Sequence, residues 1–119
     1  MKKREAGDYL EDIIEAMNRA EEFIGNIAIE DFAKDQKTVF AVVRALEIIG
    51  EAVKNIPENV KTAYPQVPWR SMAGMRNKLI HEYFGVKLEL IWKTAKKKIP
   101  PLKPIFQKIL QDMEKGDVQ

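Results

Sequence analysis

The fold of this chain depends most on residues 35–55, DQKTVFAVVRALEIIGEAVKN. Apolar residues recur in this stretch at the spacing of an α-helix, and they form a wide stripe: Val39, Phe40, Val42, Val43, Leu46, Ile48, Ile49 and Val53. A stripe of this width predicts a helix that is buried on two sides. The helix should end before Pro57, because the residue that precedes a proline disfavours the helical conformation.

One residue inside this predicted helix is a poor helix former. Gly50 costs roughly 1 kcal/mol in helix propensity relative to alanine. We therefore expect Gly50 to permit close packing of another helix or contact with a partner. Its neighbour Glu51 is interpreted as an acid at the surface or at the rim of a dimer, or as one that lies near the motif of residues 76–83.

The rest of the chain also carries helical periodicity and no strand alternation. A first long helix should begin at Asp8 and weaken at Gly25, and a short turn should follow from Glu30. Residues 59–64 predict a short helix, a motif helix should start at Pro68, and residues 88–98 and the residues after Pro101 predict two more. The motif helix has apolar anchors at Trp69, Met72, Met75, Leu79 and Ile80. The sequence therefore predicts an all-α, up-and-down four-helix bundle with short accessory helices.

Length and composition predict one domain over residues 1–119, with residues 1–5 and 116–119 frayed. The chain has 119 residues, no cysteine and a formal net charge of +2. It has no run of about eighteen apolar residues, and its start resembles a helix with acids rather than a leader. We expect a cytoplasmic protein that does not contact a membrane.

The small net charge conceals an uneven distribution. Residues 1–60 hold 8 Lys+Arg and 13 Asp+Glu, a net charge of −5, and residues 61–119 hold 12 and 5, a net charge of +7. The basic half contains Arg70, Arg76, Lys78 and Lys93, and it could attract a polyanion. The run of lysines at 96–98 has a second interpretation, as a solvated helix end favoured by the helix dipole.

Reactive side chains concentrate in residues 76–83, RNKLIHEY, which include the single histidine of the chain. Arg76 is permanently charged and suited to phosphate oxygens, and His81 can take and give a proton near neutral pH. These two groups suit cleavage of RNA in which the 2′-hydroxyl attacks the phosphorus and leaves a 2′,3′-cyclic phosphate. One histidine beside Glu82 offers too few ligands for a metal site, so we predict no metal and no cofactor.

Helix geometry separates Arg76 from His81. The two residues are five apart, and in an α-helix that spacing gives directions roughly 140° apart. Arg76 and Tyr83, which are seven apart, share a face. Either the helix loosens around His81, with Gly85 as its C-terminal cap, or a symmetric dimer completes the site; we predict both. On composition alone, His81 is also explained as a capping or packing residue and Tyr83 as a half-buried aromatic.

Two stretches resemble a known family. Residues 68–86, PWRSMAGMRNKLIHEYFGV, look like the signature of the HepT-like, or DUF86, branch of the HEPN superfamily, whose pattern is R-x4-H-x-Y. Residues 48–52, IIGEA, resemble an I-G-E-A segment of that family. The likeness runs from about Tyr9 to about Leu110, in length and in the order of the elements.

This resemblance implies a fold and a function. Members of the family are ribonuclease toxins of two-gene (type VII) toxin–antitoxin systems that dimerise and cut RNA without a metal. It implies a HEPN-type bundle, with His81 as general acid and base and Arg76 as the group that binds phosphate and stabilises the transition state. Asn77, Lys78 and Arg70 are candidates for substrate binding, although Asn77 could equally lie on the helix surface.

The resemblance also implies a partner protein. In the family, the cognate antitoxin resembles a minimal (MNT-type) nucleotidyltransferase and silences the toxin by adding AMP to the motif tyrosine, here Tyr83. Added nucleotides would place bulk and negative charge beside Arg76 and His81 and so exclude RNA.

Two alternatives belong to other classes of protein. The first is a non-catalytic HEPN protein that binds a nucleotide or a nucleotidyltransferase with the same pocket. The second is a helical interaction module without a pocket, in which Arg76 is paired with an acid such as Glu51 or Glu82.

Overall fold

The structure is a computed structural model, and it describes residues 4–84 and 87–116, with only the backbone for residues 80–84. All regular elements in these ranges are helices: α1 (Ala6–Ile24), α2 (Ile29–Lys34), α3 (Gln36–Lys54), α4 (Glu58–Ala63), α5 (Trp69–Ala73), α6 (Met75–Phe84), α7 (Leu88–Lys93), the π-helical segment η1 (Thr94–Lys98), the 3₁₀ segment η2 (Pro100–Leu102) and α8 (Lys103–Glu114). The prediction of an all-α protein is confirmed for the described residues. Among them, no helix is both long and apolar enough to cross a membrane.

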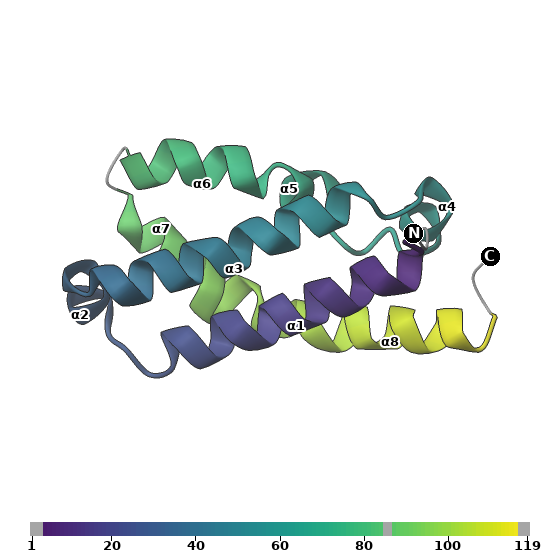
Figure 1. The fold of residues 1–119 in the computed structure, drawn as a ribbon, viewed down its shortest axis with the longest axis horizontal. Helices are drawn as coiled ribbons and strands as arrows, with labels where there is room; N and C mark the ends of the chain where they lie inside the picture. Colours follow the sequence, from purple (N-terminus) through teal and green to yellow (C-terminus); the bar gives the residue numbers. More distant parts are fainter. Residues whose placement is uncertain (1–3, 85–86, 117–119) are drawn as a thin grey trace.

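Helix α3 lies at the centre of the arrangement. Figure 1 shows α1 along one side of α3, with α5 and α6 along another side, and α8 packs against α1. Helices α1 and α3 run in opposite directions, and α6 runs back along α3. The prediction that the helix of residues 35–55 is buried on two sides is therefore confirmed.

The core is formed by the apolar stripes of these helices. Its largest fully buried side chains come from α1, α2, α3, α7 and α8 and from Ile99, and they include Leu10, Met17, Phe32, Leu46, Ile49, Ile91 and Phe106. The ring of Trp69 meets that of Phe106 edge-on, with 5.5 Å between the centroids, which is a favourable aromatic geometry. Trp92 donates a hydrogen bond from Nε1 to the carbonyl oxygen of Ile27 at 2.9 Å, so α7 is tied to the segment between α1 and α2.

Two predicted elements differ from the structure. The predicted motif helix is divided into α5 and α6 at Gly74, whose N–H donates to the carbonyl oxygen of Arg70 at 3.1 Å and closes α5. Glycine is a weak helix former, and the division falls where α5 and α6 both pack against α3. The predicted turn near Glu30 is the short helix α2.

The predicted helix of residues 88–98 ends in a π-helical turn. The N–H of Ile99 donates to the carbonyl oxygen of Thr94 at 2.9 Å, a bond that spans five residues. Ile91, Ala95 and Ile99 are all buried at a spacing of four. In an α-helix that spacing drifts by about 40° at each step. The wider π turn reduces this drift and keeps the three side chains in the core.

Gly50 is the point where α3 approaches the junction of α5 and α6. A Cβ atom at Gly50 would lie 3.1 Å from the carbonyl oxygen of Met72 and 3.4 Å from the backbone nitrogen of Arg76. These are backbone atoms of the neighbouring helices, which cannot move as a flexible side chain could. The prediction that Gly50 permits close packing of another helix is confirmed.

We predict that Gly50→Ala lowers the free energy of unfolding by about 1 kcal/mol, because the strain of overpacking, about 1–3 kcal/mol, exceeds the gain in helix propensity of about 1 kcal/mol. Gly7→Ala in α1 is the matched control, because a Cβ there would meet only a side-chain carbon of Leu110 at 4.0 Å. Urea denaturation of both variants measures the difference. A Gly50→Ala protein as stable as Gly7→Ala would show that the contact is looser than the structure has it.

Asp35 caps the N-terminus of α3. Its carboxylate accepts hydrogen bonds from the Thr38 hydroxyl at 2.7 Å and from the Thr38 backbone N–H at 3.1 Å. These bonds, that of the hydroxyl first, lower the pKa of Asp35 because they favour its charged form. Its contribution to stability is therefore present above the pKa of the unfolded chain and is lost as the pH falls through the lower pKa of the folded protein.

We predict that Asp35→Asn, which keeps a capping oxygen but cannot ionise, melts at a less pH-dependent temperature than the native protein in the acidic range. At neutral pH its melting temperature should be slightly lower, because a charged acceptor binds N–H and O–H donors more strongly. Thermal melts followed by circular dichroism between neutral and acidic pH test this. Asp31→Asn, at an exposed acid of α2, is the control, and an identical pH profile for both variants would contradict the prediction.

Candidate active site

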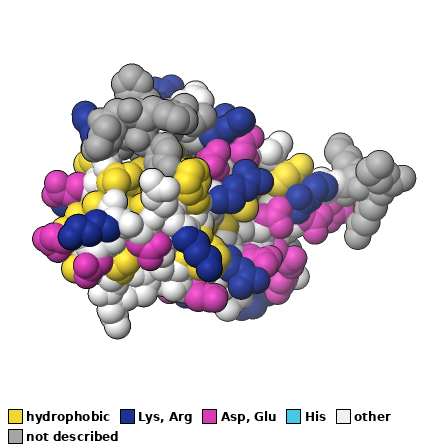
Figure 2. All heavy atoms as spheres, turned by 60° about the vertical axis from the view of Figure 1, so that its left-hand side comes forward, with side chains coloured by type: hydrophobic (Ala, Val, Ile, Leu, Met, Phe, Trp, Pro, Cys, Tyr) yellow, Lys and Arg dark blue, Asp and Glu magenta, His cyan; other side chains and the backbone are white. Residues whose placement is uncertain are grey.

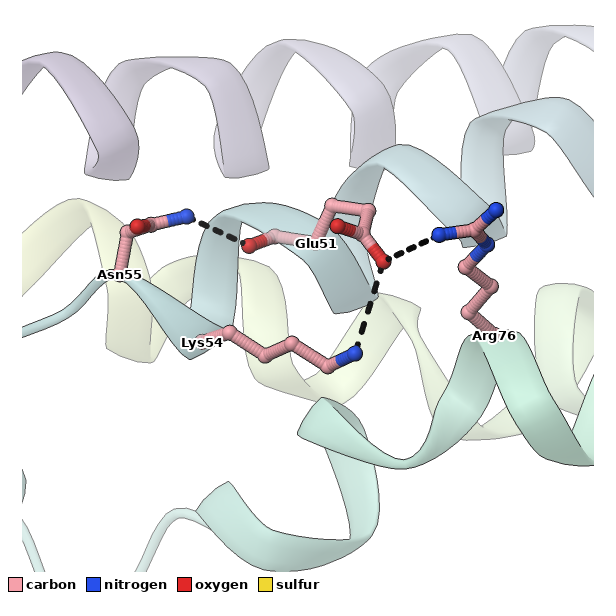
Figure 3. Close-up of polar contacts among 4 residues, drawn as sticks. All are labelled: Glu51, Lys54, Asn55 and Arg76. Atoms are coloured by element: carbon pink, nitrogen blue, oxygen red, sulfur yellow. Dashed lines mark hydrogen bonds and ion pairs between the residues drawn. The ribbon is translucent and has the colours of Figure 1, made fainter.

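The candidate site is organised around Arg76, the second residue of α6. Its Nη1 atom lies 3.3 Å from Oε1 of Glu51 on α3, and the two side chains point toward each other across the contact of the two helices (Figure 3). Both are about half exposed, at 50% for Arg76 and 45% for Glu51. Arg76 is therefore tethered on one side and open to solvent on another.

The last residue of α3, Lys54, and the residue that follows the helix, Asn55, also contact Glu51. The Nζ atom of Lys54 lies 3.6 Å from the same Oε1 of Glu51, and Asn55 donates from Nδ2 to the main-chain oxygen of Glu51 at 3.0 Å. We call Glu51, Lys54 and Arg76 the Glu51 cluster. One carboxylate faces two cations there, so the cluster keeps a net positive charge that can attract a phosphate.

The pairing of Arg76 with Glu51 is the contact that the interaction-module hypothesis expects. However, the ion pair uses one N–H of a guanidinium that has five. The structure shows no other hydrogen bond of Arg76 within the described part of the chain. The guanidinium can hold Glu51 and still accept a phosphate on its exposed side.

The other basic candidates do not gather around Arg76. Lys78 lies on the opposite side of α6, since positions two apart on an α-helix differ by about 200°. It lines a hollow of about 90 Å³ between α5, α6 and the η1–η2 segment, together with Lys98, Ser71 and Thr94 and the apolar residues Pro68, Met72, Met75, Leu79, Ile99 and Leu102. Arg70 lines a different hollow with Glu58, Lys61 and Thr62 of α4. Asn77 is exposed.

Surface charge does not form one basic face on the side that Figure 2 shows. Toward the end of the molecule where α2 lies, Lys and Arg side chains alternate with Asp and Glu side chains. The uneven charge of the sequence is thus partly balanced by surface pairs between the acidic and the basic half. Lys103 and Glu21, for example, form an ion pair at 3.1 Å.

The side chains of His81 and Tyr83 lie outside the described residues, as does all of Gly85. The backbone of α6 is α-helical from Met75 to Phe84, so the predicted loosening of the helix around His81 is absent from this span. Helix α6 packs against α3 and α7. Among the described residues, no group of three or more His, Cys, Asp or Glu side chains is placed to hold a metal ion.

Sequence reasoning named one feature of this region only among its alternatives and missed another. Glu51 was interpreted as a surface or dimer-rim acid or as an acid near the motif, and its pairing with Arg76 was expected only for the interaction module; the structure places Glu51 beside Arg76. The signal was Gly50 beside it, because a close approach of helices at one residue places the next within reach of the neighbour. The hollow that Lys78 shares with Lys98 is lined in part by Thr94 and Lys98 of the π turn, which no sequence signal indicated.

Comparison with known proteins identifies the class. The family model described as Ribonuclease HepT-like matches residues 13–109, so the chain belongs to this family. It is 59% identical over 107 residues to a protein of Thermococcus cleftensis named "Probable ribonuclease HepT", covering 90% of this chain and 97% of that protein. The resemblance found in the sequence is thus confirmed.

Two further relatives carry names of the same kind. A protein of Methanocaldococcus jannaschii named "Putative RNase MJ1216" is 46% identical over 117 residues, which cover 98% of this chain and 97% of that protein. A protein of Caldanaerobacter subterraneus subsp. tengcongensis named "Putative RNase TTE0752" is 50% identical over 103 residues, which cover 87% of this chain and 92% of that protein. No solved structure matches the chain.

We predict that the Glu51–Arg76 pair contributes little to stability, because both side chains are half exposed and Lys54 shares the carboxylate. A double-mutant cycle with Glu51→Gln and Arg76→Gln should give a coupling free energy of about 0.2–1 kcal/mol. Urea denaturation of the four proteins measures it. A coupling of several kcal/mol would instead mark the pair as a structural bridge between α3 and α6.

Proposed function

We propose that this protein is a metal-independent endoribonuclease and the toxin of a two-gene toxin–antitoxin system. The observation that carries the proposal is the half-exposed guanidinium of Arg76, tethered to α3 by Glu51, on the R-x4-H-x-Y motif of a chain that belongs to the Ribonuclease HepT-like family. The names of the three relatives, "Probable ribonuclease HepT", "Putative RNase MJ1216" and "Putative RNase TTE0752", support the activity.

The proposed reaction is a transesterification within RNA. Neutral His81 takes the proton of the 2′-hydroxyl, the 2′-oxygen bonds to phosphorus, and the bond to the 5′-oxygen breaks. The leaving 5′-oxygen takes a proton from the protonated imidazole, so the products are a 2′,3′-cyclic phosphate and a 5′-hydroxyl end. Arg76 donates hydrogen bonds to the non-bridging oxygens, where negative charge grows in the transition state.

The proposed site is composite. Positions 76 and 81 of a continuous α-helix differ by roughly 140° in direction, and α6 is continuous from Met75 to Phe84. We propose that two copies of the chain form a symmetric dimer in which motif residues of both contribute to one cleft. We also propose that the fold is a HEPN-type four-helix bundle, in which the four helical segments are α1, α3, α6 and the run from α7 to α8. We propose that the protein is cytoplasmic.

Other exposed residues are proposed to contact the substrate at a distance from the reacting phosphate. Asn77 follows Arg76 on α6 and is exposed, and Lys78 and Arg70 line separate hollows on either side of α5. Because Lys78 and Arg70 line separate hollows, we propose that they contact different phosphates of one RNA strand. Such contacts position the strand without selecting its sequence.

The proposed partner is an MNT-type nucleotidyltransferase encoded as the antitoxin. It would transfer AMP from ATP to the hydroxyl of Tyr83 and release pyrophosphate. The bound nucleotide would occupy the cleft and repel RNA by its charge. A mass increase of Tyr83 peptides by whole AMP units, after incubation with that partner and ATP, is the sign of this modification.

We predict that the purified protein, free of any partner, cuts end-labelled RNA in excess EDTA and leaves cyclic phosphate ends. His81→Ala should lower the rate by about 10²–10⁴-fold, the usual loss of a general acid or base, and Arg76→Ala should also lower it strongly. Arg19→Ala, at an arginine of α1 with similar exposure (55%), is the matched control. Mass measurement first establishes that Tyr83 is unmodified.

Each contrary result has a defined meaning. Equal cleavage by the native protein and by His81→Ala would place the activity elsewhere or in a contaminant. No cleavage by unmodified native protein would favour the non-catalytic, nucleotide-binding alternative.

A further inference from the structure

We infer that Glu51 is a positioning residue for the reaction and that it sets the pose of the Arg76 guanidinium through the contact of α3 with α6. This inference rests on the proposed function, because it assigns Arg76 to the reacting phosphate. It adds a residue that lies outside the R-x4-H-x-Y motif, 25 positions earlier in the chain. Glu51 touches Arg76 and acts through it.

The first support is the rigidity of the two backbones that carry the pair. Gly50 lets α3 approach so closely that an added Cβ would lie 3.4 Å from the backbone nitrogen of Arg76 itself. Met72 on α5 and Leu79 on α6 are buried on the same pair of short helices. The backbone positions of Glu51 and Arg76 are therefore fixed relative to each other, and the ion pair joins side chains that extend from these fixed positions.

The second support is the form of the contact. A single Nη1–Oε1 contact of 3.3 Å holds one arm of the guanidinium and leaves the remaining N–H groups for a ligand. A carboxylate that served to neutralise Arg76 would be expected to bind it through two parallel bonds. Lys54 shares the Oε1 atom, which further reduces the negative charge that a phosphate would meet (Figure 3).

The third support is the need for such a restraint. An arginine side chain with half of its surface exposed samples many rotamers, and each must be given up when the transition state forms. A restraint already present in the free protein removes part of that loss, and catalytic groups must be held within a fraction of an ångström to act. Buried Met72 and Leu79 fix the backbone, but Glu51 is the described residue that restrains the guanidinium itself.

The test is steady-state RNA cleavage by Glu51→Gln, an isosteric change that removes the charge. We expect kcat to fall roughly two- to fivefold, which matches the weak coupling predicted for this half-exposed pair, while KM stays the same or falls. KM should not rise, because loss of a negative charge leaves the cluster more attractive to RNA. Glu51→Asp should restore part of kcat, since it keeps the carboxylate on a side chain that is shorter by one methylene and so lies slightly farther from Arg76.

Controls separate positioning from other roles. Glu15→Gln removes a comparable exposed carboxylate, the partner of Arg19 on α1, and should leave kcat and KM unchanged. The melting temperature of Glu51→Gln should stay close to that of the native protein, so a lower kcat would not come from unfolding. Arg76→Ala is measured beside these variants.

The outcomes distinguish the two proposals. If the native protein cuts RNA and Arg76→Ala does not, but Glu51→Gln keeps the native kcat, the positioning role is overturned and the proposed function stands. A higher kcat/KM with unchanged kcat for Glu51→Gln would also overturn it, because Glu51 would then compete with the substrate. If the native protein does not cut RNA, or Arg76→Ala cuts equally well, the proposed function fails and the inference fails with it.

Discussion

The contact between Gly50 and the junction of α5 and α6 is the constraint on which the candidate site depends. At this point α3 lies against backbone atoms of its neighbours, with room for a hydrogen atom but not for a methyl group without strain. Because α3 is also packed along α1, the contact joins the site to the largest helix pair of the core. Gly50 lowers the helix propensity of α3, but its lack of a side chain is what allows α6 to pack so close to α3.

The same contact explains how a charged group can be both restrained and available. Burial would fix Arg76 at the cost of removing its hydration, which is expensive for an ion. Here the backbone of α6 is fixed by buried apolar neighbours such as Leu79, and the guanidinium remains half exposed. The apolar side of α6 packs into the core and fixes the backbone, and the polar side presents the guanidinium to solvent. Glu51 and Lys54 are likewise polar residues that contact Arg76 or its partner from the half-exposed side of α3.

The sequence predicted the parts of the fold that depend on local periodicity. The bounds of α1 and α3 differ by at most about two residues from the expected ones, since a regular stripe, Gly25 and Pro57 mark them. The division at Gly74 and the π turn at Thr94 were not predicted, because they depend on packing against helices that are distant in the sequence. For the site, the motif named Arg76 and Gly50 marked the close approach of another helix. The partner of Glu51 stayed open among alternatives, because it depends on the relative position of two helices. The separation of Lys78 from Arg76 follows from their spacing of two on one helix, whereas that of Arg70 depends on how α4, α5 and α6 are arranged.

The continuity of α6 constrains how its motif can work. With an α-helical backbone from Met75 to Phe84, positions 76 and 81 face directions roughly 140° apart. Glu51 fixes which direction belongs to Arg76, namely that of α3. The N–H groups that remain for a phosphate lie on the exposed side of the guanidinium. A residue five positions further along the same helix is separated from Arg76 by that angle of roughly 140°. The dimer proposed above would meet this constraint, because a second copy could supply the proton-transferring group at Arg76 without any break in α6.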